Sequence, residues 1–594
     1  MDFRRITDIL PYQLAQHSSK KAFACKYPLQ WKYYSTEQCM QQLEHISAGL
    51  LNLGVNKGDS IAMIATSSHP TWTLLDIAMQ QIGVVSVPIH ACHSEQEILH
   101  IFNDAAVQYC IVQNRNLYNK ISNIRANAIH LKQVYTFHAL PDVANWTTLT
   151  VTPTPQHRAE LLSMRAAIHE DDLATIVYTA GTTAKIKGVR LSHHNIISNV
   201  KALISSLSMD KRKRTLSFFP ISYLHERLLQ YASLATGASI YCTDTQPIHR
   251  TFLREVRPHY VFMLPRSLEL LVQYIRTKPP TPSRIVTRNR TIDWAIRIGS
   301  KYASDKTPMF YWLQLRLAQM FVFRYWQKAT GKHLMRIFLG SGHLSTPIAR
   351  LCSAAGFNLQ TTYGSTEVAG ILAFSDEAIL GKRTCPIFAP FSDVAIRVTK
   401  PDENGIGELE VNSTKVMLGY QHATALPHRA FAKDGWLKTG DLARIIKRKK
   451  HFILVGRITD QFKTLQGTSV SPAPIEHLLK TSPFIDQCMV VGNNRAFLTA
   501  LIVPHFLNLR SWCARHQIEA TDHCELIAHP RIQHLYNDLA FQISRQLSSH
   551  QHLQRSILLH ESWTIENGTL TPNMELKRNA IKERFSHLIH RVYA

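Results

Sequence analysis

Residues 178–195 read YTAGTTAKIKGVRLSHHN, and the stretch from Thr179 to Gly188 combines three threonines, two glycines and two lysines. Small hydroxyl residues and glycine let backbone N–H groups approach an anion closely, and each lysine adds a positive charge. This composition predicts a loop that holds phosphate. Its spacing differs from the common P-loop, which has glycine, four residues and then Gly-Lys-Ser/Thr, because Lys187 here precedes its glycine.

The chain on both sides of this loop alternates two kinds of pattern. Amphipathic stretches predict helices at 36–53, 70–82 and 94–105. Short apolar, β-branched runs predict buried strands at 60–66, 84–89, 109–113, 174–179, 238–242 and 260–264. Such alternation is typical of an α/β fold with parallel sheets covered by helices. The loop 179–188 then follows a strand at its carboxyl end, where α/β sheets bind ligands.

The chain is too long for one ordinary hydrophobic core. At 594 residues, two or more domains are expected. Short strands with turn signals at 385–455 indicate a β subdomain, and the last 130 or so residues carry strands and helices of their own. We therefore predict a large α/β N-terminal domain of parallel-rich, helix-covered sheets and a β subdomain, followed by a small α+β C-terminal domain.

The formal charge of +25 is the one extreme feature of the composition, with 67 Lys and Arg against 42 Asp and Glu. Such an excess favours polyanions: nucleic acid, an anionic membrane surface or polyphosphate substrates. Basic clusters occur at 211–214, 284–290 and 447–450, each of which alone is best explained as a solvated loop. Because no zinc-finger or RNP-like motif accompanies them, we expect no nucleic acid partner.

Other features exclude whole classes of protein. Apolar runs fall short of the roughly 20 residues of a membrane span, and the N-terminus lacks a signal-peptide core. The ten cysteines form no CxxC pair, which argues against a zinc site or a disulfide framework and favours a cytoplasmic protein. The aromatic stretch 311–327 fits a core helix packed on the sheet or an interfacial membrane helix, and we favour the core helix.

Four further stretches supply groups that nucleotide chemistry needs. They are TTYGSTEVAG (361–370), GWLKTGDLA (435–443), GRITDQFK (456–463) and TPNMELKR (571–578). A carboxylate beside hydroxyls, such as Glu367, can hold Mg²⁺, which keeps waters and bridges to phosphates. Asp441 can accept hydrogen bonds from ribose hydroxyls, and Arg457 offers another ribose or phosphate contact. Each stretch alone is weak evidence, because such residues are usually found in surface turns.

Together and in this order, the five stretches resemble the adenylate-forming superfamily of acyl-CoA synthetases, peptide-synthetase adenylation domains and luciferases. The resemblance covers nearly the whole chain. It points to the long-chain fatty acyl-CoA synthetase branch through GVNKGDSIAMIATSSHPTW, SFFPISYLHERLLQY, DWAIRIGSKYASD, KVMLGYQ and LTALIVP. It implies a ligase with ATP, Mg²⁺, a fatty acid and coenzyme A: a carboxylate attacks the α-phosphorus of ATP, pyrophosphate leaves, and the CoA thiol then displaces AMP.

The resemblance also implies roles for single residues. Thr179 and Glu367 would ligate Mg²⁺, Tyr363 would stack on adenine, and Asp441 and Arg457 would hold ribose. Thr179, Glu367 and Lys577 are the candidate catalytic residues. The full set of ATP-binding candidates is Thr179, Gly181, Thr182, Thr183, Lys185, Tyr363, Gly364, Ser365, Thr366, Asp441 and Arg457.

The family further implies a domain boundary and a movement. The large domain would span 1–455, and the small domain would span 456–594. The small domain would swing about a hinge near 457–460, at Thr459, so that one active site serves two half-reactions.

The chain departs from the family in ways that bear on activity. In the phosphate loop Ala180 replaces a usual serine or glycine-like residue, Ala184 a glycine and Ile186 a proline. Elsewhere, Tyr223 stands where histidine is usual, and 340–347 and Thr459 also differ. The branch resembles Thr-Pro-Thr-Met/Leu-Lys-x-Lys-Arg near its end, and its first lysine bridges the carboxylate and the α-phosphate. Glu575 occupies that position, while Lys577 is retained.

Three hypotheses follow. The first is a long-chain fatty acid–CoA ligase, cytoplasmic or peripheral on the inner membrane face, with activity reduced by Glu575. The second is an adenylate-forming enzyme with another acceptor, such as an amine or a carrier-protein thiol. The third is a weakened homologue that still binds nucleotide. Lys577 either takes over the missing lysine's role or is an ordinary exposed lysine, and we slightly favour the latter.

Overall fold

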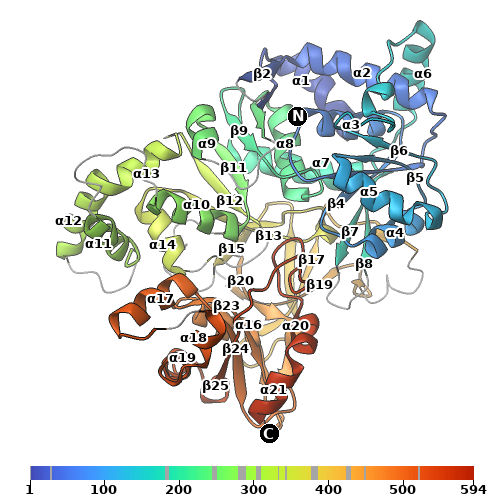
Figure 1. Cartoon of the computed structure of the whole chain (residues 1–594). Coiled ribbons are helices and arrows are strands. Elements are labelled where there is room, and N and C mark those ends of the chain that lie inside the picture. Colours follow the sequence, from blue (N-terminus) through green and yellow to red (C-terminus); the bar gives the residue numbers. More distant parts are fainter. Residues whose placement is uncertain are drawn as a thin grey trace.

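The computed structural model describes residues 2–26, 30–180, 186–243, 250–277, 289–302, 309–331, 333–340, 344, 346–375, 386–422, 430–446, 450–519 and 522–593. Figure 1 shows an upper body of helices and sheets, with the C-terminal part as a separate domain below it. The structure is therefore α/β, with large mixed sheets and a separate C-terminal domain, as the sequence predicted.

A seven-stranded sheet carries the phosphate-loop stretch. Its order is β18 (Gly419–Tyr420), β8 (Ile186–Ser192), β7 (Leu173–Ala180), β4 (Val85–His90), β3 (Ser60–Ala65), β5 (Val107–Val112) and β6 (Gln133–Thr136). The strands from β7 to β6 run parallel, whereas β8 is antiparallel to both β7 and β18. The strands predicted at 60–66, 84–89, 109–113 and 174–179 are confirmed.

The prediction of a loop over 179–188 is wrong in its extent. Strand β7 continues to Ala180 and β8 begins at Ile186, so the two strands form a hairpin and the connection spans 181–185 only. Gly188 lies in β8, where a Cβ would come within 2.9 Å of the Ile176 and Tyr178 side chains. This glycine therefore permits close packing inside the sheet and does not contribute to a loop.

A second sheet has thirteen strands and combines parallel with antiparallel pairing. Its order is β16 (Ala395–Thr399), β17 (Ile406–Asn412), β19 (Leu437–Ile446), β20 (His451–Arg457), β15 (Ile387–Pro390), β14 (Ala373–Ser375), β13 (Leu359–Tyr363), β12 (Arg336–Leu339), β11 (Tyr260–Met263), β9 (Arg214–Ser217), β10 (Ser239–Cys242), β1 (Phe23–Lys26) and β2 (Trp31–Tyr34). The run from β13 to β1 is parallel, and the strands from β14 to β16 are antiparallel and form the predicted β subdomain.

Helices cover these sheets. They are α1 (Ile9–His17), α2 (Thr36–Asn52), α3 (Pro70–Gln81), α4 (Glu95–Asp104), α5 (Arg115–Ile124), α6 (Pro155–Ala166), α7 (His193–Leu207), α8 (Leu224–Ala235), α9 (Arg250–Val256), α10 (Pro265–Thr277), α11 (Asn289–Gly299), α12 (Met309–Ala318), α13 (Arg324–Ala329) and α14 (Thr346–Ala354). Short helical turns are η1 (Ile6–Asp8), η2 (Arg125–Asn127), η3 (Trp146–Leu149), the π-helical η4 (Gln319–Phe323) and η5 (Thr366–Val368). The helices predicted at 36–53, 70–82 and 94–105 are confirmed.

A buried ion pair connects two of these helices close to β7. Arg227 of α8 donates from Nε and Nη2 to the Asp76 carboxylate of α3 at 2.8 and 2.7 Å, and from Nη1 to Thr175 Oγ1 at 3.1 Å. Both charged side chains are buried. Since an unpaired buried charge is costly, this network holds α3, α8 and β7 in one arrangement.

The C-terminal domain has its own sheet and two apolar cores. Strands β23 (Ile485–Val491), β24 (Leu498–Pro504) and β25 (Leu553–Leu558) form the sheet, and β21 (Phe462–Lys463) pairs with β22 (Ser469–Val470). The helices are η7 (Ile458–Asp460), α16 (Pro472–Leu479), α17 (Phe506–Arg515), α18 (His523–Ala528), α19 (Pro530–Ser544), η8 (Ser549–Gln551), α20 (Arg578–Arg584) and α21 (Ser586–Tyr593). Separate buried clusters lie on the two faces of the sheet, which fits an independent α+β unit.

Candidate active site

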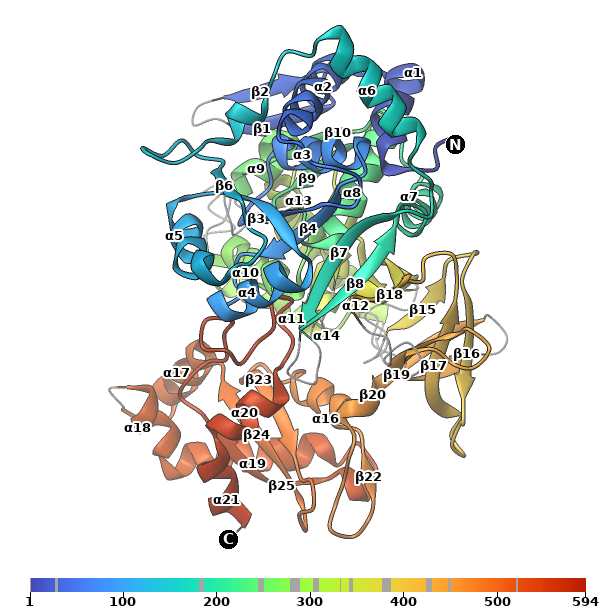
Figure 2. The same cartoon turned by 90° about the vertical axis from the view of Figure 1, so that its right-hand side faces the viewer.

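A large cleft lies where the two parts of the chain meet. Its volume is about 1990 Å³, and its walls come from α10, α11, α14, β13, β20 and the C-terminal domain. Figure 2 shows the loop that precedes α20 rising from the C-terminal domain toward α4 and α10. Eight residues named individually in the sequence analysis line this cleft: Ile186, Tyr363, Gly364, Asp441, Arg457, Thr459, Glu575 and Lys577. Residues far apart in the chain are thus brought to one site.

Asp441 and Arg457 form an ion pair at the cleft. They are directly opposite each other on β19 and β20, and Arg457 Nε lies 3.4 Å from Asp441 Oδ1. Tyr363, at the end of β13, donates its hydroxyl to Asp441 Oδ2 at 2.8 Å. Burial raises the pKa of the Asp441 carboxyl, while Arg457 opposes this shift. The carboxylate is therefore oriented by two partners, as a group that recognises a diol should be.

The Tyr363 ring is held from several sides. It packs edge-on against Phe452, with centroids 5.2 Å apart, and lies 5.7 Å from the Phe388 ring in a tilted arrangement. Burial, followed by the nearby Asp441 charge, raises the pKa of the Tyr363 hydroxyl well above its usual value. The phenol is thus a neutral donor to Asp441, and its predicted stacking on adenine stays a prediction.

Glu367 is positioned by a turn that two residues distant in the sequence hold, one from a helix and one from a loop. The turn η5 carries Glu367, and its end at Ala369 has a left-handed backbone with φ of 52°. Asn199 of α7 donates from Nδ2 to the Val368 and Ala369 carbonyls, both at 3.0 Å. The Met417 N–H donates to the Glu367 carbonyl at 2.8 Å. These bonds favour the strained turn and fix the place of the carboxylate.

Tyr420 contacts that carboxylate and was missed in the sequence analysis. Its hydroxyl donates to Glu367 Oε1 at 3.0 Å, and its pKa is raised by burial and then by the Glu367 charge. The stretch KVMLGYQ that contains it was quoted only for the family resemblance. The signal was therefore present, but nothing local to the sequence pairs Tyr420 with Glu367, 53 positions away.

Thr179 lies on the same sheet face as this tyrosine. Thr179 is opposite Lys187 across β7 and β8, and Tyr420 is opposite Val189 across β8 and β18. Directly opposite residues share a face, as do residues two apart on one strand. Lys187 Nζ accordingly lies 5.2 Å from the centre of the Tyr420 ring. The sheet therefore places a threonine hydroxyl, a lysine and the partner of Glu367 on one face.

Some predicted residues lie outside the described part of the chain. These are Gly181, Thr182, Thr183 and Lys185 of the phosphate loop, together with Ala184. Ser365 and Thr366 are described and lie beside Glu367, at the start of η5. Among the described residues that line the cleft, neither Thr179 nor Glu367 appears.

Glu575 belongs to a tight turn in the loop before α20. Its N–H donates to Thr571 Oγ1 at 3.1 Å, the Thr571 N–H donates to the Glu575 carbonyl at 2.9 Å, and Met574 has φ of 64°. The turn brings Glu575 Oε2 to within 3.9 Å of Arg457 Nη2. Glu575 is the largest influence that raises the pKa of Arg457, ahead of Asp441. The negative side chain of Glu575 is therefore close to Arg457, the cation that also pairs with Asp441 and is predicted to hold ribose.

Lys577 acts electrostatically on a residue of α4 in the cleft wall. Its N–H donates to the Thr569 carbonyl at 2.9 Å, and the residue is the N-cap of α20. The pKa of Glu97 in α4 is lowered to about 2, chiefly by the hydrogen bond from His93 and with a smaller contribution from Lys577. Glu97 and Lys577 both line the cleft. The structure thus separates the environments of Glu575 and Lys577, which the sequence could not do.

The predicted hinge lies in the turn that follows β20. Thr459 is the middle residue of η7, and its neighbour Asp460 is paired with Arg578 Nε at 3.2 Å. Arg578 also pairs with Glu476 of α16 at 2.6 Å. Arg578, the first residue of α20, therefore fastens the loop of Glu575 to the start of the C-terminal domain.

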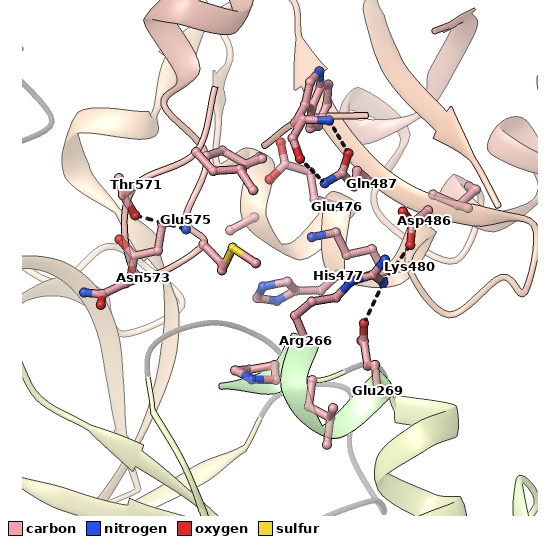
Figure 3. A pocket seen from close by; sticks show the side chains of 18 of the residues that line it. Arg266, Glu269, Glu476, His477, Lys480, Asp486, Gln487, Thr571, Asn573 and Glu575 are labelled. Atoms are coloured by element: carbon pink, nitrogen blue, oxygen red, sulfur yellow. Dashed lines mark hydrogen bonds and ion pairs between the residues drawn. The ribbon is translucent and has the colours of Figure 1, made fainter. Parts of the chain in front are cut away.

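Direct contacts join the two sides of the cleft. The Tyr223 hydroxyl donates to the Pro572 carbonyl at 3.3 Å, and Arg266 Nη1 lies 3.1 Å from Asp486 Oδ1. Figure 3 shows Arg266 and Glu269 of α10 facing Lys480 and Asp486 of the C-terminal domain. The four charged side chains in Figure 3 were not singled out in the sequence, because an isolated charged residue carries no signal of its partner.

Two features are absent from the residues that the structure describes. Within the described residues, no group of three or more His, Cys, Asp and Glu side chains is arranged to hold a metal ion. No helix among these residues combines the length and apolar character that crossing a bilayer requires.

Comparison with known proteins assigns the family. Residues 10–421 match the family described as AMP-binding enzyme, and residues 459–594 match the AMP-binding enzyme C-terminal domain. Similar curated proteins include the long-chain-fatty-acid–CoA ligase FadD15 of Mycobacterium bovis, 24% identical over 95% of this chain and 92% of that one. The long-chain-fatty-acid–CoA ligase ACSBG2 of Gallus gallus is 23% identical over 100% of this chain and 81% of that one.

Solved structures agree in fold. ATP-bound MatB from Rhodopseudomonas palustris has a TM-score of 0.69 at 18% identity, covering 98% of this chain and 99% of that chain. The adenylation domain of a carboxylate reductase from Mycobacterium chelonae has a TM-score of 0.73 at 18% identity, and the match covers 99% of this chain and 91% of that chain. Because the family match spans well over half of the sequence, the chain belongs to the AMP-binding, adenylate-forming enzymes, in the long-chain fatty acyl-CoA synthetase branch that its motifs resemble.

Proposed function

We propose that this protein is an ATP-dependent long-chain fatty acid–CoA ligase that forms an acyl-adenylate and then an acyl-CoA. The observation that carries the proposal is the assembly of Tyr363, Asp441 and Arg457 at one wall of the cleft. Curated relatives along nearly the whole chain are named long-chain-fatty-acid–CoA ligases, which supports this acyl class. The charge of +25 suits the polyphosphate of ATP and also an anionic membrane surface.

In the proposed adenylation step, the chain's own residues position and neutralise charge. Asp441 accepts hydrogen bonds from the ribose hydroxyls while Arg457 and Tyr363 hold its orientation. Gly181, Thr182, Thr183 and Lys185 would hold the leaving pyrophosphate. Phosphoryl chemistry of this kind depends on alignment and electrostatics more than on covalent participation by the protein.

The residues present fit Mg²⁺ as a companion of ATP. Thr179 and Glu367 supply a hydroxyl and a carboxylate, the oxygen ligands that this ion prefers, and Tyr420 already orients one carboxylate oxygen. The ion would neutralise phosphate charge when bound. Protein ligands this few are typical of Mg²⁺ sites that phosphates and waters complete.

Pyrophosphate exchange with a panel of fatty acids tests the function. We expect exchange that depends on long-chain acids, together with acyl-CoA formation when CoA is added. Exchange without a CoA thioester would assign another acceptor, such as an amine or a carrier-protein thiol. Nucleotide binding without exchange would instead assign a weakened homologue, so each result separates one hypothesis from the other two.

We further propose that 1–455 and 456–594 move relative to each other about Thr459. The turn η7 that contains it connects β20 to the C-terminal domain. In the present arrangement, the loop of Glu575 contacts the large domain through Tyr223 and lies beside Arg457, just before the hinge, which suits the adenylation step. The CoA step would then need the loop to withdraw and another face of the small domain to approach.

Replacing Thr459 with proline is expected to slow the CoA step about tenfold or more while leaving adenylation nearly unchanged. Proline fixes φ near −65°, so a hinge that must change its backbone angles loses this freedom. Thr459→Ala, which retains the freedom, is the matched control. Single-turnover measurement of adenylate and of thioester formation gives the two rates, and equal slowing of both would contradict the hinge assignment.

A further inference from the structure

An exposed apolar stripe follows α12 and η4. The large side chains of Phe310, Trp312, Leu313, Leu317, Met320 and Phe321 are all exposed, and we call them the apolar stripe. Exposure is 65% for Phe310, 51% for Trp312 and 55% for Leu313. Single exposed apolar residues are ordinary, but six within twelve consecutive positions form a patch that calls for a partner.

The opposite face of the same segment is firmly attached to the protein. Tyr311, Leu315, Ala318, Val322, Phe323 and Trp326 are buried. The Tyr311 hydroxyl donates to the Ile298 carbonyl of α11 at 3.1 Å, and Gln319 donates to the Ala354 carbonyl of α14 at 3.0 Å. The prediction of a core helix is thus right for one face only, because the other face is exposed. The stripe is displayed by a fixed scaffold.

The position of this scaffold suits contact with a large flat partner. Figure 1 shows α11, α12 and α13 on an outer edge of the molecule, at the left of the view. Helix α11 contributes Ile296 and Arg297 to the wall of the cleft. The segment therefore lies between the molecular surface and the candidate active site.

Charge within the segment that carries the stripe has a single sign. Residues 309–329 contain no Asp or Glu. Arg316, Arg324 and Lys328 are exposed among or directly after the apolar residues. An interfacial segment typically combines Trp, Phe and Leu on its apolar side with Lys and Arg beside them. This combination matches a surface that is negative at its headgroups and apolar just beneath.

The same charge argues against a second copy of the chain as the partner. Each copy carries a formal charge of +25, and two stripes meeting would bring their arginines and lysines together. Like charges at an interface are unfavourable, whereas an anionic lipid leaflet attracts each basic residue near it. Charge complementarity therefore favours lipid over self-association.

We propose that the α12–η4 stripe docks the protein on an anionic lipid bilayer, inserting its apolar side chains at the headgroup level. Arg316, Arg324 and Lys328 attract the anionic headgroups, and Trp312 sits at the interface, where indole rings are favoured. The partner is the bilayer itself. The proposal extends the proposed ligase function, but binding to vesicles needs neither ATP, CoA nor fatty acid and is therefore tested separately.

The first experiment removes the apolar groups. The variant Phe310→Gln/Leu313→Gln/Met320→Gln changes three exposed side chains, and the control Ile129→Gln/Leu162→Gln/Leu465→Gln removes three others that are exposed at least as fully as these on average. In co-sedimentation with phosphatidylcholine–phosphatidylglycerol vesicles, we expect the stripe variant to lose binding at least about tenfold. The control should bind as the wild type does. Equal binding by wild type and stripe variant would overturn the proposal.

The second experiment removes the charges. Arg316→Gln/Arg324→Gln/Lys328→Gln is compared with Lys20→Gln/Arg510→Gln/Arg531→Gln, which has the same net charge. Basic residues near an anionic surface each contribute about fivefold in affinity, so we expect a loss of about tenfold or more for the first variant only. Equal losses would show that net charge, and not this segment, drives binding, and would overturn the assignment.

The depth to which Trp312 enters the bilayer and the oligomeric state of the protein complete the test. Trp312→Phe retains an apolar ring, so it should bind vesicles while showing less tryptophan quenching by brominated lipid than the wild type. Unchanged quenching would contradict insertion.

Sedimentation velocity without lipid should give the same mass for wild type and stripe variant. A wild-type dimer that this variant dissociates, without vesicle binding, would instead assign the stripe to a second copy.

Discussion

Replacing Glu367 with glutamine is expected to lower the rate of acyl-adenylate formation by about 10²-fold or more. The change keeps the shape of the side chain but removes the one negative charge proposed to hold Mg²⁺, and loss of one electrostatic stabiliser typically has this magnitude. ATP binding should weaken less, because Asp441 and Arg457 contact another part of the nucleotide in our proposal. Single-turnover adenylate formation and equilibrium ATP binding measure the two effects.

Two control variants separate this role from general damage. Glu403→Gln removes the same charge in an exposed turn and should leave the rate unchanged. Tyr420→Phe removes only the hydrogen bond to Glu367 and should cost about fivefold, the typical value of one such bond. An unchanged rate in Glu367→Gln would show that the metal assignment is wrong.

Replacing Glu575 with lysine is expected to accelerate acyl-adenylate formation at least about tenfold. Glu575 lies 3.9 Å from Arg457 in the cleft, where our proposal places the nucleotide. A carboxylate there repels the attacking carboxylate and the α-phosphate, whereas an ammonium attracts both, and tenfold corresponds to only about 1.4 kcal/mol. The CoA step should change little, because the loop of Glu575 would by then have moved away.

The controls for Glu575 address charge and register. Glu583→Lys makes the same charge change on the exposed side of α20 and should have no effect on the rate. Glu575→Gln should give an intermediate gain, since it removes repulsion without adding attraction. Lys577→Ala tests whether Lys577 has taken over: a large loss, with no gain from Glu575→Lys, would mean that the motif has shifted by two residues. No effect from either would remove this loop from the active site.

The different surroundings of Glu575 and Lys577 indicate which of the two occupies the position of the family's lysine. Glu575 is paired with the arginine predicted to hold ribose, while Lys577 influences Glu97 of α4, another residue of the cleft wall. This arrangement supports Glu575 as the occupant of the usual lysine position and Lys577 as a residue of the interdomain contact. The sequence slightly favoured an ordinary exposed lysine at this position, whereas the structure leaves Lys577 half-buried in the wall of the cleft.

The local parts of the fold were predictable because local periodicity encodes them. The apolar runs of β3 and β4 and the amphipathic pattern of α2 gave correct elements, since burial of a strand or of one helix face depends on neighbouring residues. The phosphate-loop stretch was placed too long. Its flanking residues alternate in a way that also suits a β hairpin, and only pairing of β7 with β8 showed where the strands end.

The sequence by itself determined the α/β class, the family and the kinds of chemical group available, because composition and motif order can be read without knowing which residues are in contact. Tertiary structure alone decided which groups meet. Tyr420 finds Glu367, Asn199 holds its turn, Glu575 faces Arg457, and the stripe on α12 stays exposed while its other face is buried. Each outcome depends on packing between elements far apart in the chain, and such contacts leave no period or motif in the sequence around either partner.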